Sequence, residues 1–271
     1  MPQDAHRTID AIWLIESPKL IASLARTVRD LDLAEEFAQD AFVAALAQWP
    51  DEGIPHNPGA WLMTVAKRRT IDYIRRETVL GRKTEELERD VDAWANGADA
   101  GLDEIDDDLL RLMFVACHPI LPKEARVALA LRLLGGVTTP EIARAFLVSE
   151  PTVAQRIVRA KRALTAARVP FEVPAGPDRA ARLASVLEVI YLIFNEGYSA
   201  SADDDVLRPH LCEDALRLGR VLAGLMPHDS EVHGLVALME IQSSRAKARV
   251  DASGDPVLLP DQDRGRWDYL A

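Results

Sequence analysis

The stretch VTTPEIARAFLVSEPTVAQRIVRAKR, residues 137–162, decides the fold that the sequence predicts. Its pattern indicates two helices joined by a short turn at Leu147. Thr139 followed by Pro140 predicts the start of the first helix, because threonine caps free amides and proline lacks the N–H that a first turn leaves unused. Ser149 predicts the start of the second helix by the same capping chemistry. The stretch therefore predicts a helix-turn-helix.

The second helix of this motif has an inner and an outer face. Apolar residues spaced by three and four predict the inner stripe, which is Val153, Ile157, Ala160 and Leu164. The outer face carries Thr152, Gln155, Arg156, Arg159, Lys161 and Arg162. Glutamine and arginine can read adenine and guanine edges in the major groove, and the later basic residues can contact phosphates. This face predicts DNA binding, with an ordinary helical hairpin in a bundle as the alternative.

A second basic segment is AWLMTVAKRRTIDYIRRE, residues 60–77. Its first half is apolar, and Trp61 in that half is interpreted as a core residue. Its second half carries Lys67, Arg68, Arg69, Arg75 and Arg76. Basic residues on successive helical turns can follow a nucleic-acid backbone, so the segment is compatible with nucleic-acid binding.

An acidic helix is predicted over residues 33–46, because alanines and phenylalanines recur there at spacings of three and four. Its other face presents Glu36 and Asp40 one turn apart, next to Glu35 and Gln39. On this segment alone, the pattern favours a solvated charged face over a binding surface.

Nearly all periodic segments repeat at 3.6 residues, so the sequence predicts an all-α fold. The chain has 271 residues and a net charge of -11. Positive charge gathers in residues 67–83 and 156–168, whereas residues 84–108 hold eleven acidic residues and one basic residue, Arg89. Two basic patches separated by an acidic spacer are compatible with nucleic-acid binding despite the overall negative charge.

Four blocks are predicted along the chain. They are a first helical domain at 1–80, a flexible acidic linker at 81–105, a compact second domain at 106–170 and a third helical region at 171–271. Prolines at 170, 174 and 177 mark the last boundary, because proline interrupts helices.

Several classes of protein are disfavoured by the composition. No run of eighteen apolar residues exists and the N-terminus is polar, so we expect a cytoplasmic protein without a membrane segment. Cys117 and Cys212 are the two cysteines, which offers no disulfide framework. Cys117 lies beside His118, but no further ligand follows at zinc spacing. Nothing in the sequence predicts catalytic residues, a cofactor or a metal site.

Three segments in a fixed order carry a family resemblance. AEEFAQDAF at 34–42, the basic segment at 60–77 and the helix-turn-helix within 135–164 resemble the extracytoplasmic-function sigma factors of the sigma-70 superfamily. The resemblance covers residues 7 to about 170. It implies a non-enzymatic transcription initiation factor with sigma region 2 in residues 1–80 and sigma region 4 in residues 106–170.

The resemblance also implies partners and residue roles. The acidic helix would bind bacterial core RNA polymerase through Glu36, Gln39 and Asp40. The basic helix would bind the minus-ten element of promoter DNA through Lys67, Arg68, Arg75 and Arg76. The helix-turn-helix would bind the minus-thirty-five element through its outer face.

Two residues depart from the pattern of that family. Leu147 stands where many relatives have glycine in the turn. A β-carbon is costly in a left-handed conformation, so we expect a different backbone there. Arg69 stands where many relatives have asparagine.

The region after residue 171 adds further apolar stripes. The first comprises Leu183, Val186, Leu187, Ile190, Tyr191 and Phe194. This region, particularly YLIFNEGYSA at 191–200 and LLPDQDRGRWD at 258–268, resembles a subgroup with a tetratricopeptide-like extension. The resemblance implies a regulatory role, which we expect to act through intramolecular contact with the sigma domains. We also expect the extension to continue past residue 271.

Two other functions remain open from the sequence. One is a one-component helix-turn-helix regulator whose C-terminal region senses a ligand. The other is a helical protein-interaction scaffold whose basic patches are solvated surfaces.

Overall fold

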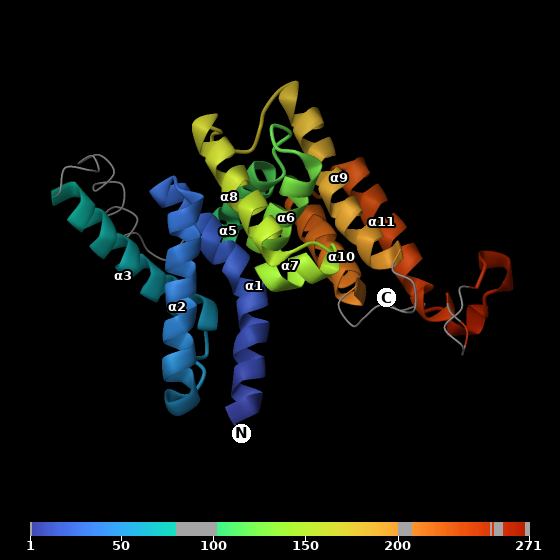
Figure 1. The fold of residues 1–271 in the computed structure, drawn as a ribbon, viewed down its shortest axis with the longest axis horizontal. Helices are drawn as coiled ribbons and strands as arrows, with labels where there is room; N and C mark the ends of the chain where they lie inside the picture. The colour runs from blue at the N-terminus through green and yellow to red at the C-terminus, as the bar shows by residue number, and fades with distance from the viewer. Residues whose placement is uncertain (1, 80–101, 200–207, 250, 252–256, 269–271) are drawn as a thin grey trace. The chain divides into compact units, whose positions relative to one another are not determined.

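The computed structural model describes residues 2–79, 102–199, 208–249, 251 and 257–268, and these residues form helices without a β-strand (Figure 1). The predicted all-α fold is therefore confirmed. The α-helices are α1 (Pro2–Val28), α2 (Leu31–Glu52), α3 (Pro58–Val79), α5 (Leu102–Ala116), α6 (Lys123–Leu133), α7 (Thr139–Ala145), α8 (Glu150–Ala166), α9 (Asp178–Ser199), α10 (Arg208–Leu225) and α11 (Ser230–Ser244). Short 3-10 turns follow as η1 (Ala246–Ala248), η2 (Leu259–Asp261) and η3 (Arg264–Arg266).

The chain forms two compact units. The first contains residues 1–116, 133–137 and 161–173, and the second contains residues 117–132, 138–160 and 174–271. Most of the predicted acidic linker lies outside the described residues, and α5 begins inside its last part, at Leu102. Among the described helices, none has both the length and the apolar character needed to cross a bilayer.

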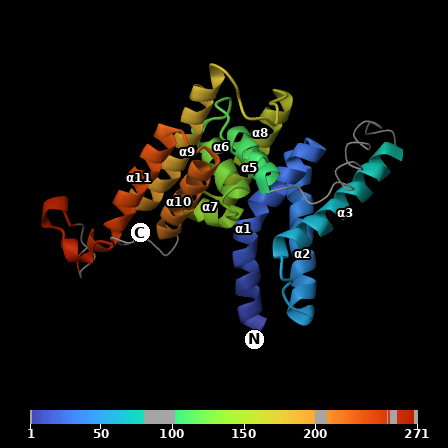
Figure 2. The same cartoon turned by 180° about the vertical axis from the view of Figure 1, so that it is seen from behind.

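The first unit is built on α1 and α2, which lie side by side in both views (Figures 1 and 2). Asp30 starts α2, because its Oδ1 accepts hydrogen bonds from the amides of Asp32 at 2.8 Å and Leu33 at 3.1 Å. The buried face of α2 consists mainly of small residues, which let neighbouring helices approach closely, and its buried residues are Ala34, Glu35, Phe37, Ala38, Ala41, Ala45 and Trp49.

Aromatic contacts join α3 to α2. The ring centroids of Trp49 and Trp61 lie 5.2 Å apart in an edge arrangement, and those of Phe37 and Tyr73 lie 5.5 Å apart. Such pairs contribute beyond the apolar area that they bury. The interpretation of Trp61 as a packing residue agrees with this contact.

A buried carboxylate joins α5 to α1. The Asp108 side chain is 1% exposed and pairs with Arg26 of α1 at 3.0 Å and with Arg111 of its own helix at 2.6 Å. A buried charge is tolerated when it is paired and hydrogen-bonded. Asp108 therefore anchors α5 within the first unit.

The helix-turn-helix is present as α7 and α8. Thr138, and not Thr139, is the N-cap of α7, because the Glu141 carboxylate accepts from both the amide and the hydroxyl of Thr138 and closes a capping box. The predicted start was therefore wrong by one residue. Ser149 precedes α8 as predicted, and its hydroxyl lies 2.8 Å from that of Thr152. The predicted inner stripe of α8 is buried throughout.

The turn between these helices uses a left-handed leucine. Leu147 has a φ of 51°, and the next amide, from Val148, donates to the carbonyl of Ala143 at 3.0 Å. The expectation of a different backbone was wrong: the hydrogen bonds of the turn impose the conformation that glycine would adopt. The Leu147 side chain is 73% exposed, so packing against other residues contributes little to offset the strain.

The C-terminal region forms three packed helices in the second unit, with α10 next to both α9 and α11 (Figure 2). In α9 the predicted stripe is buried at Leu183, Val186, Ile190 and Phe194, whereas Tyr191 is 42% exposed. Tyr191 thus belongs to the predicted stripe in sequence but lies at its solvent-exposed edge. Gly219 of α10 faces α11 so closely that an added β-carbon would lie 2.7 Å from Met239.

We expect Leu147→Gly to stabilise the protein by about 1 kcal/mol, because it removes the left-handed strain of a residue with a β-carbon. The denaturant midpoint of the transition that includes the helix-turn-helix measures the change. Leu147→Ala is the matched control, since it removes the exposed side chain but keeps the β-carbon, and we expect no comparable gain. Equal midpoints for the glycine variant and the wild type would contradict the strain argument.

Candidate nucleic-acid interface

The outer face of α8 carries most of the side chains that the sequence assigned to it. Gln155, Arg159 and Arg162 are exposed, and Arg156 is half-buried. In the part of the chain that the structure describes, no carboxylate pairs with these three arginines. Thr152 is half-buried, and its hydroxyl is engaged with Ser149 at the start of the helix. The face can thus donate hydrogen bonds to base edges and phosphates.

Lys161 differs from its neighbours on α8. Its side chain is only 7% exposed, and its Nζ lies 2.7 Å from Asp32 Oδ1 and 2.6 Å from Glu35 Oε2. These atoms all belong to the first compact unit. The expected exposure of Lys161 is therefore wrong for this arrangement, and its predicted DNA contact stays a prediction. Helical periodicity could not reveal this pair, because its members lie more than a hundred residues apart.

The acidic face of α2 is open to solvent at Glu36 and Gln39 and half-buried at Asp40. Gln39 Nε2 donates to Glu35 Oε1 at 3.0 Å. Glu35 itself is buried and accepts from both Gln39 and Lys161. The three candidate polymerase contacts thus lie on α2 beside Glu35, whose buried carboxylate already accepts these two hydrogen bonds.

The basic face of α3 presents Arg68, Arg75 and Arg76 to solvent, with Lys67 half-buried. Arg76 Nε donates to the carbonyl of Asp72 at 3.0 Å, which holds the guanidinium along the helix. Arg69 is exposed beside Arg68 and adds to the positive charge. A row of exposed basic side chains such as this one can contact successive phosphates of a nucleic-acid backbone.

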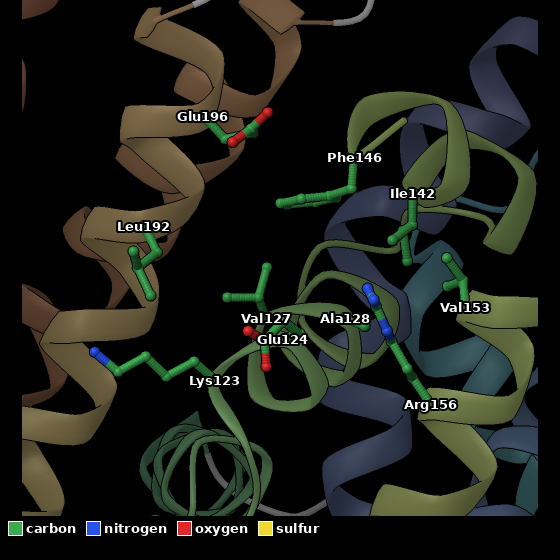
Figure 3. A pocket seen from close by; sticks show the side chains of 10 residues that line it. All are labelled: Lys123, Glu124, Val127, Ala128, Ile142, Phe146, Val153, Arg156, Leu192 and Glu196. Carbon is green, nitrogen blue, oxygen red and sulfur yellow. The ribbon is translucent and has the colours of Figure 1, made fainter. Parts of the chain in front are cut away.

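A pocket lies within the second unit between the helix-turn-helix and α9 (Figure 3). Its empty volume is about 650 Å³, open mouth included. The lining residues come from α6, α7, α8 and α9 and from the C-cap of α7, and they are Lys123, Glu124, Val127, Ala128, Ile142, Phe146, Val153, Arg156, Leu192 and Glu196. Arg156, a candidate base-reading residue, thus shares a pocket with Leu192 and Glu196 of α9.

A buried arginine connects α6 to α9 in the same unit. Arg126 is 7% exposed, and its Nη1 donates to Ser185 Oγ at 2.5 Å and pairs with Glu188 at 3.0 Å. Ser185 in turn donates to the carbonyl of Cys117 at 2.5 Å. The sequence did not single out these residues, although a serine inside the apolar stripe of α9 was a possible signal.

Glu188 also pairs with Lys123 at 2.5 Å. The hydrogen bond from Lys123, followed by the charge of Arg126, holds the pKa of Glu188 below its ordinary value despite partial desolvation. Because the pKa of Glu188 is lowered, its ion pairs stabilise the fold fully at pH values above the ordinary carboxyl pKa. This stabilisation is lost as the pH falls through the lowered pKa.

Parts of the chain match known protein families, and the matches come in the same order along the chain as the faces on α3 and α8. Residues 14–79 match the family model for sigma-70 region 2, and residues 111–164 match that for sigma-70 region 4. The ECF RNA polymerase sigma factor SigK of Mycobacterium ulcerans is 30% identical over 149 residues, which are 52% of this chain and 75% of the relative. The chain belongs to the ECF sigma factors.

Two further relatives extend the comparison. The uncharacterized protein R00370 of Rhizobium meliloti is 46% identical over 265 residues, 96% of this chain and 62% of the relative. The probable ECF RNA polymerase sigma factor SigI of Mycobacterium tuberculosis is 27% identical over 181 residues, 64% of this chain and 60% of the relative. The chain thus spans about 60% of the length of these two proteins. No solved structure matches it.

The matches assign the helices to the parts of a sigma factor. Region 2 extends from within α1 to the end of α3, and region 4 extends from within α5 to near the end of α8. Residues 182–271 match a family of unknown function (DUF6596). Sigma factors act in transcription initiation without catalysing a reaction, in agreement with the prediction that the chain is not an enzyme.

Neither cysteine lies in a metal site: the described residues contain no cluster of three or more potential metal-ligating side chains. Burial raises the pKa of the Cys117 thiol to about 12 and that of Cys212 to about 11. Both thiols are therefore protonated at neutral pH. Cys117 is buried and Cys212 is half-buried, so the two differ in access.

We expect iodoacetamide at pH 8 to modify Cys117 only after unfolding, because reaction needs both a thiolate and access. Cys212 should react first in the folded protein. Mass spectrometry of digested samples, with a guanidinium-unfolded control in which both thiols react, measures the order. Rapid modification of Cys117 while the circular dichroism remains native would contradict the burial argument.

Proposed function

We propose that this protein is an alternative sigma factor that directs core RNA polymerase to specific promoters and initiates transcription in the cytoplasm. The observation that best supports this proposal is the outer face of α8. Gln155 and Arg159 are exposed there, and the apolar stripe on the opposite side of the helix is buried. The region 2 match precedes this helix, as it does in a protein that reads two promoter elements. The ECF relatives support the same assignment.

We assign roles to the three faces. Glu36, Gln39 and Asp40 of α2 contact core polymerase. The basic residues of α3 bind the minus-ten element, and they are Lys67, Arg68, Arg75 and Arg76. The α8 face binds the minus-thirty-five element, with Gln155 and Arg156 toward bases, Thr152 at the helix start, and Arg159, Lys161 and Arg162 toward phosphates.

We expect Arg159→Ala to weaken DNA binding to all sequences alike and to reduce the slope of log affinity against log salt by about one, because one phosphate contact is lost. Gln155→Ala should instead reduce discrimination between promoter sequences. Run-off transcription with core polymerase, from DNA upstream of the protein's own gene, measures promoter output, and fluorescence anisotropy at several salt concentrations measures affinity.

Arg220→Gln is the matched control for the loss of one arginine charge. Arg220 is exposed and pairs with Glu240 at 2.7 Å within the C-terminal extension. Its salt slope and promoter output should equal those of the wild type. No core binding and no promoter-dependent transcript from the wild type would reject the sigma-factor proposal.

The same experiments separate two other functions. A one-component regulator would footprint a duplex operator without polymerase and would not start transcription. A protein-interaction scaffold would retain its binding partners after Arg156→Ala and Arg159→Ala. The matches to both regions 2 and 4 favour the sigma factor over either alternative.

We further propose that the C-terminal extension is a tetratricopeptide-like domain that regulates the sigma domains by intramolecular contact. The antiparallel pair of α10 and α11 supports the first part of this proposal. The Arg126 network, which includes Ser185 and Glu188, and the pocket shared by Arg156 and Leu192 support the second.

We expect Arg126→Met to loosen α9 from α6, because it removes the buried donor to Ser185 and Glu188 while largely keeping the volume. Promoter output should then change, and trypsin should cut more readily near α9. Arg220→Gln again serves as the control, since its ion pair lies within the extension. Unaltered transcription together with faster cleavage would show that the contact has no regulatory effect.

A further inference from the structure

Two half-buried charges of opposite sign line the pocket between the helix-turn-helix and α9 (Figure 3). Arg156 enters it from α8, and Glu196 enters it from α9. Both side chains are half-buried. Among the described residues, no carboxylate pairs with Arg156 and no cation pairs with Glu196. A charge that is partly removed from water is stabilised by an opposite charge, so each of these side chains would gain from a partner.

The other two charged lining residues are already stabilised. Lys123 Nζ pairs with Glu188 Oε1 at 2.5 Å. Glu124 is exposed in the first turn of α6, where water and the free amides of the helix start stabilise a carboxylate. Arg156 and Glu196 are therefore the lining charges best placed to select a ligand.

Apolar side chains line the space between these two charges. Phe146 and Leu192 lie on opposite sides of the pocket, and both are half-buried although they are large (Figure 3). Val127 and Ile142 add buried apolar surface to the lining. The volume of about 650 Å³, open mouth included, lies within the range of about 300 to 1,000 Å³ that is typical of sites for small ligands.

We propose that this pocket binds a small dipolar molecule, with a carboxylate at one end, an ammonium group at the other and an apolar chain or ring between them. The carboxylate pairs with the planar guanidinium of Arg156, which can donate two parallel hydrogen bonds. The ammonium group pairs with Glu196. The apolar middle covers the exposed surface of Phe146 and Leu192.

A ligand at this site competes with DNA, because Arg156 is also a candidate base-reading residue. One guanidinium cannot donate the same hydrogen bonds to a ligand carboxylate and to a base edge. Bound ligand therefore weakens DNA binding by the α8 face, and bound DNA weakens ligand binding by the same factor. This consequence rests on the proposed function, whereas the ligand site itself does not.

Isothermal titration calorimetry of the full-length protein tests the site. The probes are 6-aminohexanoate, 8-aminooctanoate and 10-aminodecanoate, which differ in the separation of their two charges. The alkanoate and the alkylammonium of the same chain length carry one charge each and serve as matched ligands. We expect the best-fitting amino acid to bind at least about tenfold more tightly than either matched ligand, because it forms both charge pairs.

Two substitutions separate the two ends of the ligand. Arg156→Gln should weaken binding of the amino acid and of the alkanoate about tenfold without weakening that of the alkylammonium. Glu196→Gln should weaken the amino acid and the alkylammonium and spare the alkanoate. Arg159→Gln and Glu231→Gln are the matched controls, since both residues are exposed and neither lines the pocket, and they should bind all probes as the wild type does.

Arg156→Lys gives a second measure of the same contact, and circular dichroism checks that each variant is folded. It keeps the charge but loses the planar fork, so it should lose less affinity than Arg156→Gln. Binding of none of the three amino acids to the wild type would overturn the site. Affinities in folded Arg156→Gln and Glu196→Gln that equal those of the wild type would overturn it as well.

Fluorescence anisotropy of promoter DNA, with and without saturating amino acid, tests the competition. The ligand should weaken DNA binding by the wild type, and an unchanged DNA affinity would overturn the competition. A wild type that binds the ligand but neither core polymerase nor promoter DNA would reject the proposed function and leave the ligand site intact.

Discussion

The structure depends on the burial of one apolar stripe along α8. Val153, Ile157, Ala160 and Leu164 are each less than 9% exposed, and this stripe sets the rotation of the helix about its axis. Once that rotation is set, Gln155 and Arg159 have to face outward. The DNA-binding assignment is therefore a consequence of packing, because the same contacts that stabilise the helix-turn-helix present its polar face.

The other charged residues follow a similar rule, in which burial decides the role. Arg159 and Arg162 remain exposed and available to phosphates, whereas Lys161, next to Arg162 in sequence, is enclosed by two carboxylates. Arg126 likewise is buried and bonds a serine and a glutamate of α9. Exposed charges suit binding to a flexible, hydrated polyanion, and buried charges suit contacts with a single geometry.

Within the second unit, α9 is hydrogen-bonded to α6 and to the residue that follows α5. Arg126, Ser185 and the Cys117 carbonyl form a continuous buried chain of hydrogen bonds. Leu192 and Glu196 line the pocket that also contains Arg156. A change in the position of α9 would alter the surroundings of a residue assigned to base reading, which gives the proposed regulation a physical route.

The sequence by itself determined the helical class, the buried stripe of α8 and the family, because these depend on local periodicity and on motifs in a fixed order. It misplaced the start of α7 by one residue, since Thr138 and Thr139 are both good caps and the position of Glu141 decides between them. The tertiary structure alone decided the left-handed Leu147, the exposure of Tyr191 and the partners of Lys161 and Arg126. Each of these depends on contacts between residues distant in sequence, or on a turn closed by its own hydrogen bonds, and neither leaves a periodic signal in the chain.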